Sequence, residues 1–158
     1  MNYLISTFFF FLSLSSFAQE ATVAVSLTPA GSFKLKSTEI KGVAENKGDH
    51  FEAHNIKVGL QNVTTGITLR DEHTKKHLEV ANFSDAILVS ATGKDGKGTG
   101  TIKIKGIEKK IEGTFKVVGN KLLAEFALNL PDFKIEGIKY MGVGVDDEVK
   151  VNVSVPIK

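Results

Sequence analysis

The feature that most constrains this chain is an alternation of apolar and polar residues with a period of two. In residues 149–157, valine or isoleucine occupies every second position, and Lys150, Asn152 and Ser154 lie between them. Successive side chains of a β-strand point to opposite faces, so this pattern predicts a strand with one buried and one solvated face. Pro156 has no amide hydrogen for a β-ladder, so we expect it at the end of the strand.

The same alternation recurs over most of the chain. Residues 111–117 and 122–130 both alternate, and Gly119-Asn120 between them predicts a β-hairpin. The apolar parity switches between Ala53 and Ile56, which predicts a β-bulge near His54-Asn55. Further strands are expected at the shorter alternating or apolar runs 23–27, 33–36, 51–60, 86–91 and 102–105, the last entered through a glycine-rich turn at 93–100.

About eight strands joined by short turns predict an all-β domain, interrupted by one short helix from Asp71 to about Val80. Chains with this strand spacing form antiparallel sandwiches or barrels. A barrel is favoured because closure of the sheet removes exposed edges, which are a hazard for strands as apolar as these. Periodicity alone leaves the sandwich open as the alternative.

The N-terminal segment, residues 1–18, has the pattern of a secretory signal peptide. An apolar run from Leu4 to Leu14 precedes Ser16-Phe17-Ala18, which is typical of a cleavage site. The run is shorter than the roughly 20 residues of a membrane-spanning helix. The chain has no cysteine, which favours a bacterial periplasm over animal secretion. We therefore predict an exported, periplasmic protein with a single domain at 19–158; a retained N-terminal anchor is the alternative.

Charge and motif content argue against several functional classes. The chain has 20 basic and 18 acidic residues, and its lysines are spread along the strands without a basic patch of interleaved aromatic residues, so nucleic-acid binding is not expected. No G-x-S-x-G nucleophile motif occurs. The acidic run Asp146-Asp147-Glu148 is interpreted as a solvated turn before a strand. We therefore expect no catalytic residues, no enzymatic activity and no cofactor.

The segment "RDEHTKKH", residues 70–77, is the strongest candidate for a reactive site. His73 and His77 are four residues apart, and on a helix this spacing suits two metal ligands. A metalloprotease helix carries glutamate directly after the first histidine, and here that position is Thr74. Metal binding through the two histidines is therefore the less favoured alternative, and the favoured interpretation contains no metal site.

Under the favoured interpretation, this segment is a structural helix that packs against the barrel. We expect Asp71 to cap its N-terminus, and the later lysines suit the helix dipole. Leu78 and Phe83 are expected to dock the helix onto the barrel. The Arg70 guanidinium is expected to fork onto carboxylates or carbonyls.

The remaining chemistry of the chain is apolar. A barrel of about eight strands is either filled by side chains or holds one small ligand. The inward positions hold mainly valine, isoleucine and leucine, with glycines at 98, 100 and 113. The chain has no tryptophan, and only the phenylalanines that follow residue 18 are available to fill the interior. This composition permits a cavity without requiring one.

Three stretches together carry a family resemblance. "TTGITLRDEHTKKHLEVANFSDAIL" (64–88), "GTGTIKIKGIEKKIEGTFKV" (98–117) and "LPDFKIEGIKYMGVGVDDEVKVNVSV" (130–155) occur in the order found in the YceI-like family, which this chain resembles. In the first stretch the matching positions are Thr65-Gly66, Arg70-Asp71-Glu72-His73, Leu78 and Phe83. The N-terminal "ATVAVSLTPAGSFKL" departs from the family pattern, because it is shorter and lacks a His-Ser pair.

The resemblance implies an exported protein with a lipocalin-like barrel, which binds a long apolar molecule such as a polyisoprenoid or a fatty-acid amide, with a homodimer as one implied assembly and no enzymatic role. A ligand-free envelope stress or interaction module is the alternative. Arg70, Asp71, His73 and Leu78 are expected to be structural. The expected ligand-binding residues are Ile102, Ile104, Phe115, Val117, Phe126, Leu128, Val151 and Val153 in the interior, with Phe83 and Tyr140 near a mouth.

Overall fold

The computed structural model describes residues 19–28, 31–140 and 142–158. Its longer strands are β1 (Glu20–Thr28), β2 (Ser32–Ser37), β5 (Phe51–Gly59), β6 (Asp85–Lys94), β7 (Lys97–Ile104), β8 (Ile107–Val118), β9 (Lys121–Asn129) and β12 (Glu148–Pro156). The shorter elements are β3 (Ile40–Lys41), β4 (Ala44–Asn46), β10 (Lys139–Tyr140), β11 (Val143–Val145), helix α1 (Thr68–His77) and the 3-10 helix η1 (Leu130–Phe133). The predicted all-β class with one short helix is confirmed.

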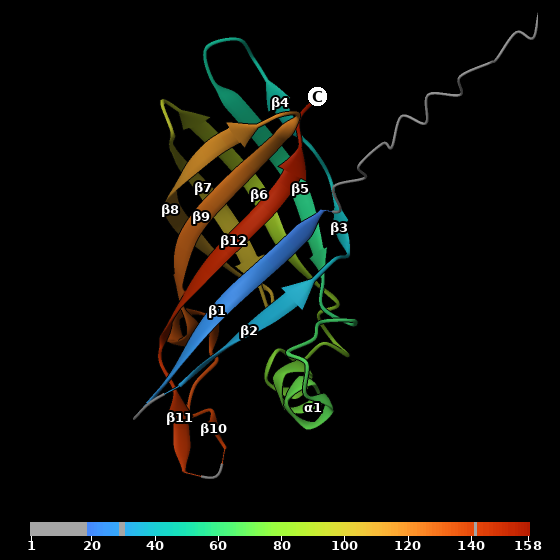
Figure 1. Ribbon diagram of the computed structural model, residues 1–158, viewed down its shortest axis with the longest axis vertical. Coiled ribbons are helices and arrows are strands. Elements are labelled where there is room, and N and C mark those ends of the chain that lie inside the picture. Colours follow the sequence, from blue (N-terminus) through green and yellow to red (C-terminus); the bar gives the residue numbers. More distant parts are fainter. Residues whose placement is uncertain (1–18, 29–30, 141) are drawn as a thin grey trace, which may run out of the picture.

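The strands form one antiparallel sheet that curls into a nearly closed barrel (Figure 1). Its order is β10-β11-β1-β12-β9-β8-β7-β6-β5-β3, with β2 paired to β1 and β4 paired to β5. Backbone bonds join the two sides: Lys36 N–H and Thr64 C=O lie 2.9 Å apart, and Lys158 N–H donates to Ala44 C=O at 2.8 Å. The barrel is thus confirmed over the alternative sandwich, and these bonds satisfy backbone groups that an open edge would expose.

The turns follow the sequence signals. Gly119 and Asn120 join β8 to β9, with Val118 opposite Lys121, and Pro156 is the last residue of β12. Asp95 and Gly96 join β6 to β7 with φ of 53° and 78°, the left-handed conformation that a two-residue hairpin turn requires.

An irregularity occurs near the predicted bulge. Asn55 has φ of 51° and interrupts β5 between two buried inward residues, Ala53 and Ile56. On the neighbouring strand, the register of β6 against β7 shifts between Leu88 and Ser90. Because His54 and Asn55 both lie between Ala53 and Ile56, the extra residue in β5 lets Ile56 point inward again after the switch in alternation.

The helix begins and ends three residues earlier than predicted. Its N-cap position is Ile67, which provides no side-chain hydrogen bond, so the expectation that Asp71 caps the helix is wrong. Asp71 lies within the helix, where its N–H donates to the Ile67 carbonyl at 3.0 Å. Glu79 adopts φ of 50°, a left-handed conformation that ends the helix before Val80. Among the described residues, no helix has the length and apolarity that crossing a membrane requires.

The two ends of the barrel differ. At one end lie the hairpin turns between β4 and β5, β6 and β7, and β8 and β9 (Figure 1). At the other end lie α1, β10 and β11. We call these the hairpin end and the helix end.

Candidate functional site

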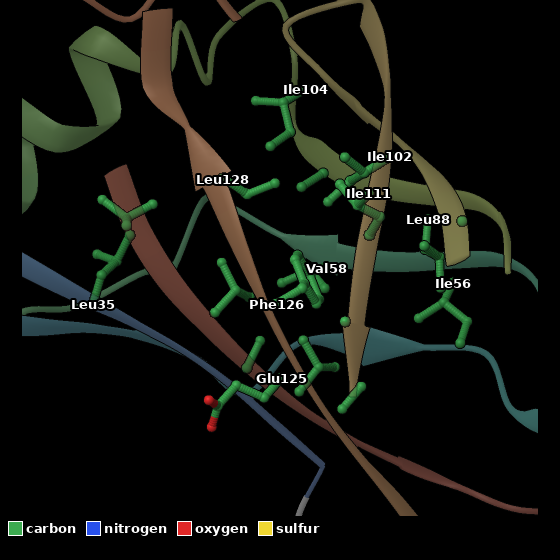
Figure 2. Close-up of a pocket in the computed structure, with 18 of the residues that line it drawn as sticks. Leu35, Ile56, Val58, Leu88, Ile102, Ile104, Ile111, Glu125, Phe126 and Leu128 are labelled. Carbon is green, nitrogen blue, oxygen red and sulfur yellow. The ribbon is translucent and has the colours of Figure 1, made fainter. Parts of the chain in front are cut away.

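A cavity of about 730 Å³ occupies the interior of the barrel. Its size lies within the roughly 300–1,000 Å³ of small-molecule sites. Aliphatic side chains from most strands form its wall. Figure 2 labels Leu35, Ile56, Val58, Leu88, Ile102, Ile104, Ile111, Phe126 and Leu128 among them. A wall of this composition removes apolar ligand surface from water without offering it fixed polar partners.

Small residues form part of the cavity wall. Gly93, Gly98 and Gly100, together with Ala91 and Ala124, border the cavity. The glycines allow close packing within the wall, because a Cβ added at Gly100 would lie 2.7 Å from the Ser90 carbonyl oxygen and one at Gly98 would lie 3.1 Å from the Thr92 carbonyl oxygen. The cavity that the composition permitted is present in the folded barrel.

An aromatic pair narrows the hairpin end. The rings of Phe51 and Phe115 meet edge to face, with centroids 5.6 Å apart and planes at 73°. Phe115 lies over Gly93, where an added Cβ would come within 2.6 Å of its ring. Glycine at 93 therefore makes room for the ring, and both phenylalanines line the cavity.

One face of α1 lines the helix end. Leu69, Arg70, His73, Thr74 and His77 all border the cavity, and their spacing of three to four residues places them on one side of the helix. No residue of α1 is buried, so the helix covers the barrel without being part of its core.

Arg70 makes a contact that the sequence did not predict. Its guanidinium carbon lies 4.4 Å from the centroid of the Phe33 ring, on β2. Within the described part of the chain, the guanidinium makes this cation–π contact instead of the expected fork onto carboxylates or carbonyls, and the contact holds it beside the cavity that both residues line. The delocalised, weakly hydrated guanidinium suits such a stack.

Asp71 fixes the loop that leads into the helix. Its carboxylate accepts hydrogen bonds from the Thr65 N–H and Thr65 Oγ1, both at 2.6 Å, and from Thr64 Oγ1 at 3.0 Å. Burial raises the pKa of Asp71, but the donors of Thr65 and Thr64 outweigh it and hold the pKa below its usual value. The Asp71 carboxylate thus bonds to the loop before the helix instead of capping the helix, and its structural role stays a prediction.

Lys105 ties the other end of α1 to the barrel. Its Nζ lies 2.8 Å from Glu79 Oε1 and donates to the Lys134 carbonyl at 3.1 Å. The lysine side chain is only 10% exposed, whereas Glu79 is 47% exposed. These contacts connect the β7–β8 turn to the chain just after α1 and to the loop after η1.

His77 lines the cavity on the same face of α1 as Arg70 and His73. Burial lowers the pKa of His77, and the nearby positive charges of His73, Lys105 and Lys76 lower it further. These surroundings therefore bias His77 toward its neutral form. Within the described ranges, no three histidine, aspartate or glutamate side chains come together as a metal site would require.

The predicted interior residues mostly line the cavity. Seven of them do so: Ile102, Ile104, Phe115, Phe126, Leu128, Val151 and Val153. Contact of these residues with a ligand stays a prediction.

Two predicted residues lie outside the cavity wall. Val117 is 46% exposed close to the β8–β9 turn, because the strand extends beyond the interior there. Phe83 packs over Gly106 in the β7–β8 turn instead, where its ring comes within 3.2 Å of a Cβ placed there. The side chain of Tyr140 lies outside the described part of the structure.

The sequence missed the lining role of the helix. Arg70, His73 and Leu78 were expected to be structural only, yet they border the cavity together with His77 and with Lys139 of β10. The spacing of Arg70, His73 and His77 on one helix face was the available signal. Its interpretation required knowing that the helix lies across the end of the barrel.

Comparisons with known proteins agree with this architecture. The model of the family described as YceI-like domain matches residues 13–157. A polyisoprenoid binding domain from Saccharophagus degradans, implicated in plant cell wall breakdown, is 13% identical, with a TM-score of 0.59 over 87% of this chain and 91% of that one.

Burkholderia cenocepacia BcnA is 12% identical, with a TM-score of 0.64 over 85% of this chain and 94% of that one. No curated protein matches the chain. At these identities the solved structures establish the shared fold, and the family match covers nearly the whole sequence. The chain therefore belongs to the YceI-like domain family.

Proposed function

We propose that the protein binds one long apolar or amphipathic molecule, of polyisoprenoid or fatty-acid-like chemistry, inside the barrel. The observation that carries this proposal is the cavity of about 730 Å³ with its predominantly aliphatic wall. The Saccharophagus degradans domain, which has a similar fold, is described as polyisoprenoid binding, and this supports the same ligand class here. The proposed role is binding and not catalysis.

The energetics of such binding are favourable. Burial of an alkyl chain gains about 0.8 kcal/mol per methylene, so a twelve-carbon tail gains roughly 10 kcal/mol before opposing terms. Ordering the ligand and restricting its motion offset part of this gain. The remainder corresponds to dissociation constants of about micromolar to nanomolar.

Export to the periplasm is part of the proposal. Its support is the apolar run and the small residues in 1–18, which lie outside the described residues. Fractionation of a bacterial expression host and mass measurement of the product test it. A periplasmic product beginning at Gln19 is expected; a cytoplasmic product that retains residues 1–18 would refute export.

Native mass spectrometry of the purified protein, followed by lipid extraction, tests the binding function. We expect one apolar ligand per barrel, or binding of one member of a prenyl and fatty-acyl panel after the protein is stripped. The proposal fails if nothing co-purifies and no member of the panel binds. The same spectra report whether the protein forms the homodimer expected from the family resemblance.

A further inference from the structure

The ionisable residues that line the cavity are distributed unevenly. Within the described residues they are Arg70, His73, His77, Lys139, Glu52 and Glu125. The four basic residues belong to α1 and β10, at the helix end. The two acidic residues belong to β5 and β9.

The two carboxylates do not face the interior. Glu125 follows the inward-facing Ala124 and precedes the inward-facing Phe126, so strand alternation directs it outward. Figure 2 shows its carboxylate pointing away from the apolar side chains. Glu52 precedes the buried Ala53, and its carboxylate is bonded to His50 Nε2 at 3.2 Å. Arg70 and Lys139 therefore contribute positive charge to the cavity lining, and the two lining carboxylates do not face it.

The acidic residues in and just after α1 do not neutralise this end of the cavity. The Asp71 carboxylate accepts hydrogen bonds from Thr64 and Thr65, and the Glu79 carboxylate forms an ion pair with Lys105. Glu72 is exposed and does not line the cavity. Among the described residues, no carboxylate forms an ion pair with Arg70 or Lys139.

We propose that the bound molecule is an amphiphile with an anionic head group, a carboxylate or a phosphate, held at the helix end by Arg70, His73, His77 and Lys139. This inference rests on the proposed lipid-binding function and specifies the ligand class. The apolar tail extends along the aliphatic wall toward Phe51 and Phe115. Beside an apolar cavity a charged hydrogen bond is stronger than in water, and the charges of Arg70 and Lys139 favour an anion over a neutral head.

Four ligands with the same twelve-carbon tail test this proposal. Dodecyl phosphate and dodecanoic acid carry anionic heads, dodecanol a neutral head and dodecyltrimethylammonium a cationic head. Each is titrated into lipid-stripped protein below its aggregation concentration, with inorganic phosphate as a fifth arm. We expect the anionic ligands to bind about tenfold more tightly than dodecanol, the cation to bind more weakly than dodecanol, and inorganic phosphate not to displace them.

Variants assign the preference to the helix end. Arg70→Gln and Lys139→Gln each remove one charge. Lys139 is exposed, so we expect its replacement to leave the barrel folded. Each variant is expected to reduce the preference for dodecyl phosphate over dodecanol several-fold. Lys150→Gln, on the outer face of β12, is the matched control and should leave the preference unchanged.

The outcomes separate this inference from the proposed function. Equal binding of the anionic ligands and dodecanol overturns the anionic head group but leaves lipid binding in place. An anion preference that survives in both variants overturns the assignment to the helix end. Displacement by inorganic phosphate alone overturns an amphiphile as the ligand. Failure of all four tailed ligands to bind refutes the proposed function itself.

Discussion

Replacement of Ala124 by leucine tests whether the ligand's chain occupies the barrel. Ala124 lines the cavity from β9, opposite Phe115 of β8 and Val153 of β12. Leucine adds three carbon atoms on the inward side of the strand. Displacing about three ligand methylenes at about 0.8 kcal/mol each removes about 2.4 kcal/mol of binding free energy, which raises the dissociation constant about 50-fold.

The folded protein should tolerate this change. The added atoms enter open space, so they do not overpack a filled core, and we expect the free energy of unfolding to change by less than about 1 kcal/mol. Ala127→Leu is the matched control, because Ala127 is three residues along the same strand and exposed on the outer face. It should bind as the unmodified protein does.

Displacement of the fluorescent fatty acid cis-parinaric acid measures the effect. The chain has no tryptophan, so protein fluorescence contributes little background. Thermal unfolding of each variant is recorded alongside, to separate a loss of affinity from a loss of structure. The reasoning is refuted if Ala124→Leu remains folded and binds within twofold of the Ala127→Leu control.

Three further predictions concern stability. Asp71→Ala removes the bonds to Thr64 and Thr65 and should cost about 1 kcal/mol, or a few degrees in Tm by calorimetry; an unchanged Tm would contradict this. At Gly113 a Cβ would lie 2.4 Å from the Glu125 carbonyl oxygen, so Gly113→Ala should lower the free energy of unfolding in urea by about 2 kcal/mol. Gly144 has open space around the position of a Cβ, so Gly144→Ala is the control and should cost far less. Equal losses in the two variants would refute the steric argument. Burial lowers the pKa of His77 in the folded protein, so His77 is protonated at a higher pH in the unfolded chain than in the folded one. Proton uptake by the unfolded chain therefore lowers the free energy of unfolding as pH falls below about 6.5. The Tm of His77→Gln minus that of the unmodified protein should therefore increase when the pH is lowered from 7.5 to 5.5. If this difference in Tm is the same at both pH values, the pKa of His77 is not lowered by folding.

The difference in Tm between His77→Gln and the unmodified protein reports on His77 alone, although His50 also titrates. The pKa of His50 is raised, first by its hydrogen bond to Asp49 and then by that to Glu52, so its contribution is present at low pH and lost as pH rises. That contribution has the opposite sign to the one from His77. Because it is common to both proteins, it cancels in their difference.

Local sequence was sufficient for the strands and their turns. The alternation in 149–157 predicted β12, and Gly119-Asn120 predicted the β8–β9 turn. Such signals act between residues close in the chain, through strand alternation and turn conformation. The parity switch at Ala53 and Ile56 likewise predicted an irregularity where Asn55 adopts a left-handed φ.

The helix was predicted less accurately, because its ends depend on tertiary contacts. Asp71 has the side chain of a cap, but Thr64 and Thr65 bind it from the preceding loop, and the helix begins earlier. Arg70 was expected to contact carboxylates or carbonyls, but β2 brings the Phe33 ring against its guanidinium. Neither partner is specified by spacing within the segment itself.

By itself, the sequence determined that this chain forms an antiparallel β-domain with an apolar inner face, because side-chain alternation is a property of each strand alone. Tertiary structure decided that the inner face encloses an open cavity, since the volume left inside depends on which side chains meet across the barrel. It also decided that the basic residues of "RDEHTKKH" border that cavity. A charge pattern on one helix becomes part of a site only when closure of the sheet brings the helix across the end of the barrel.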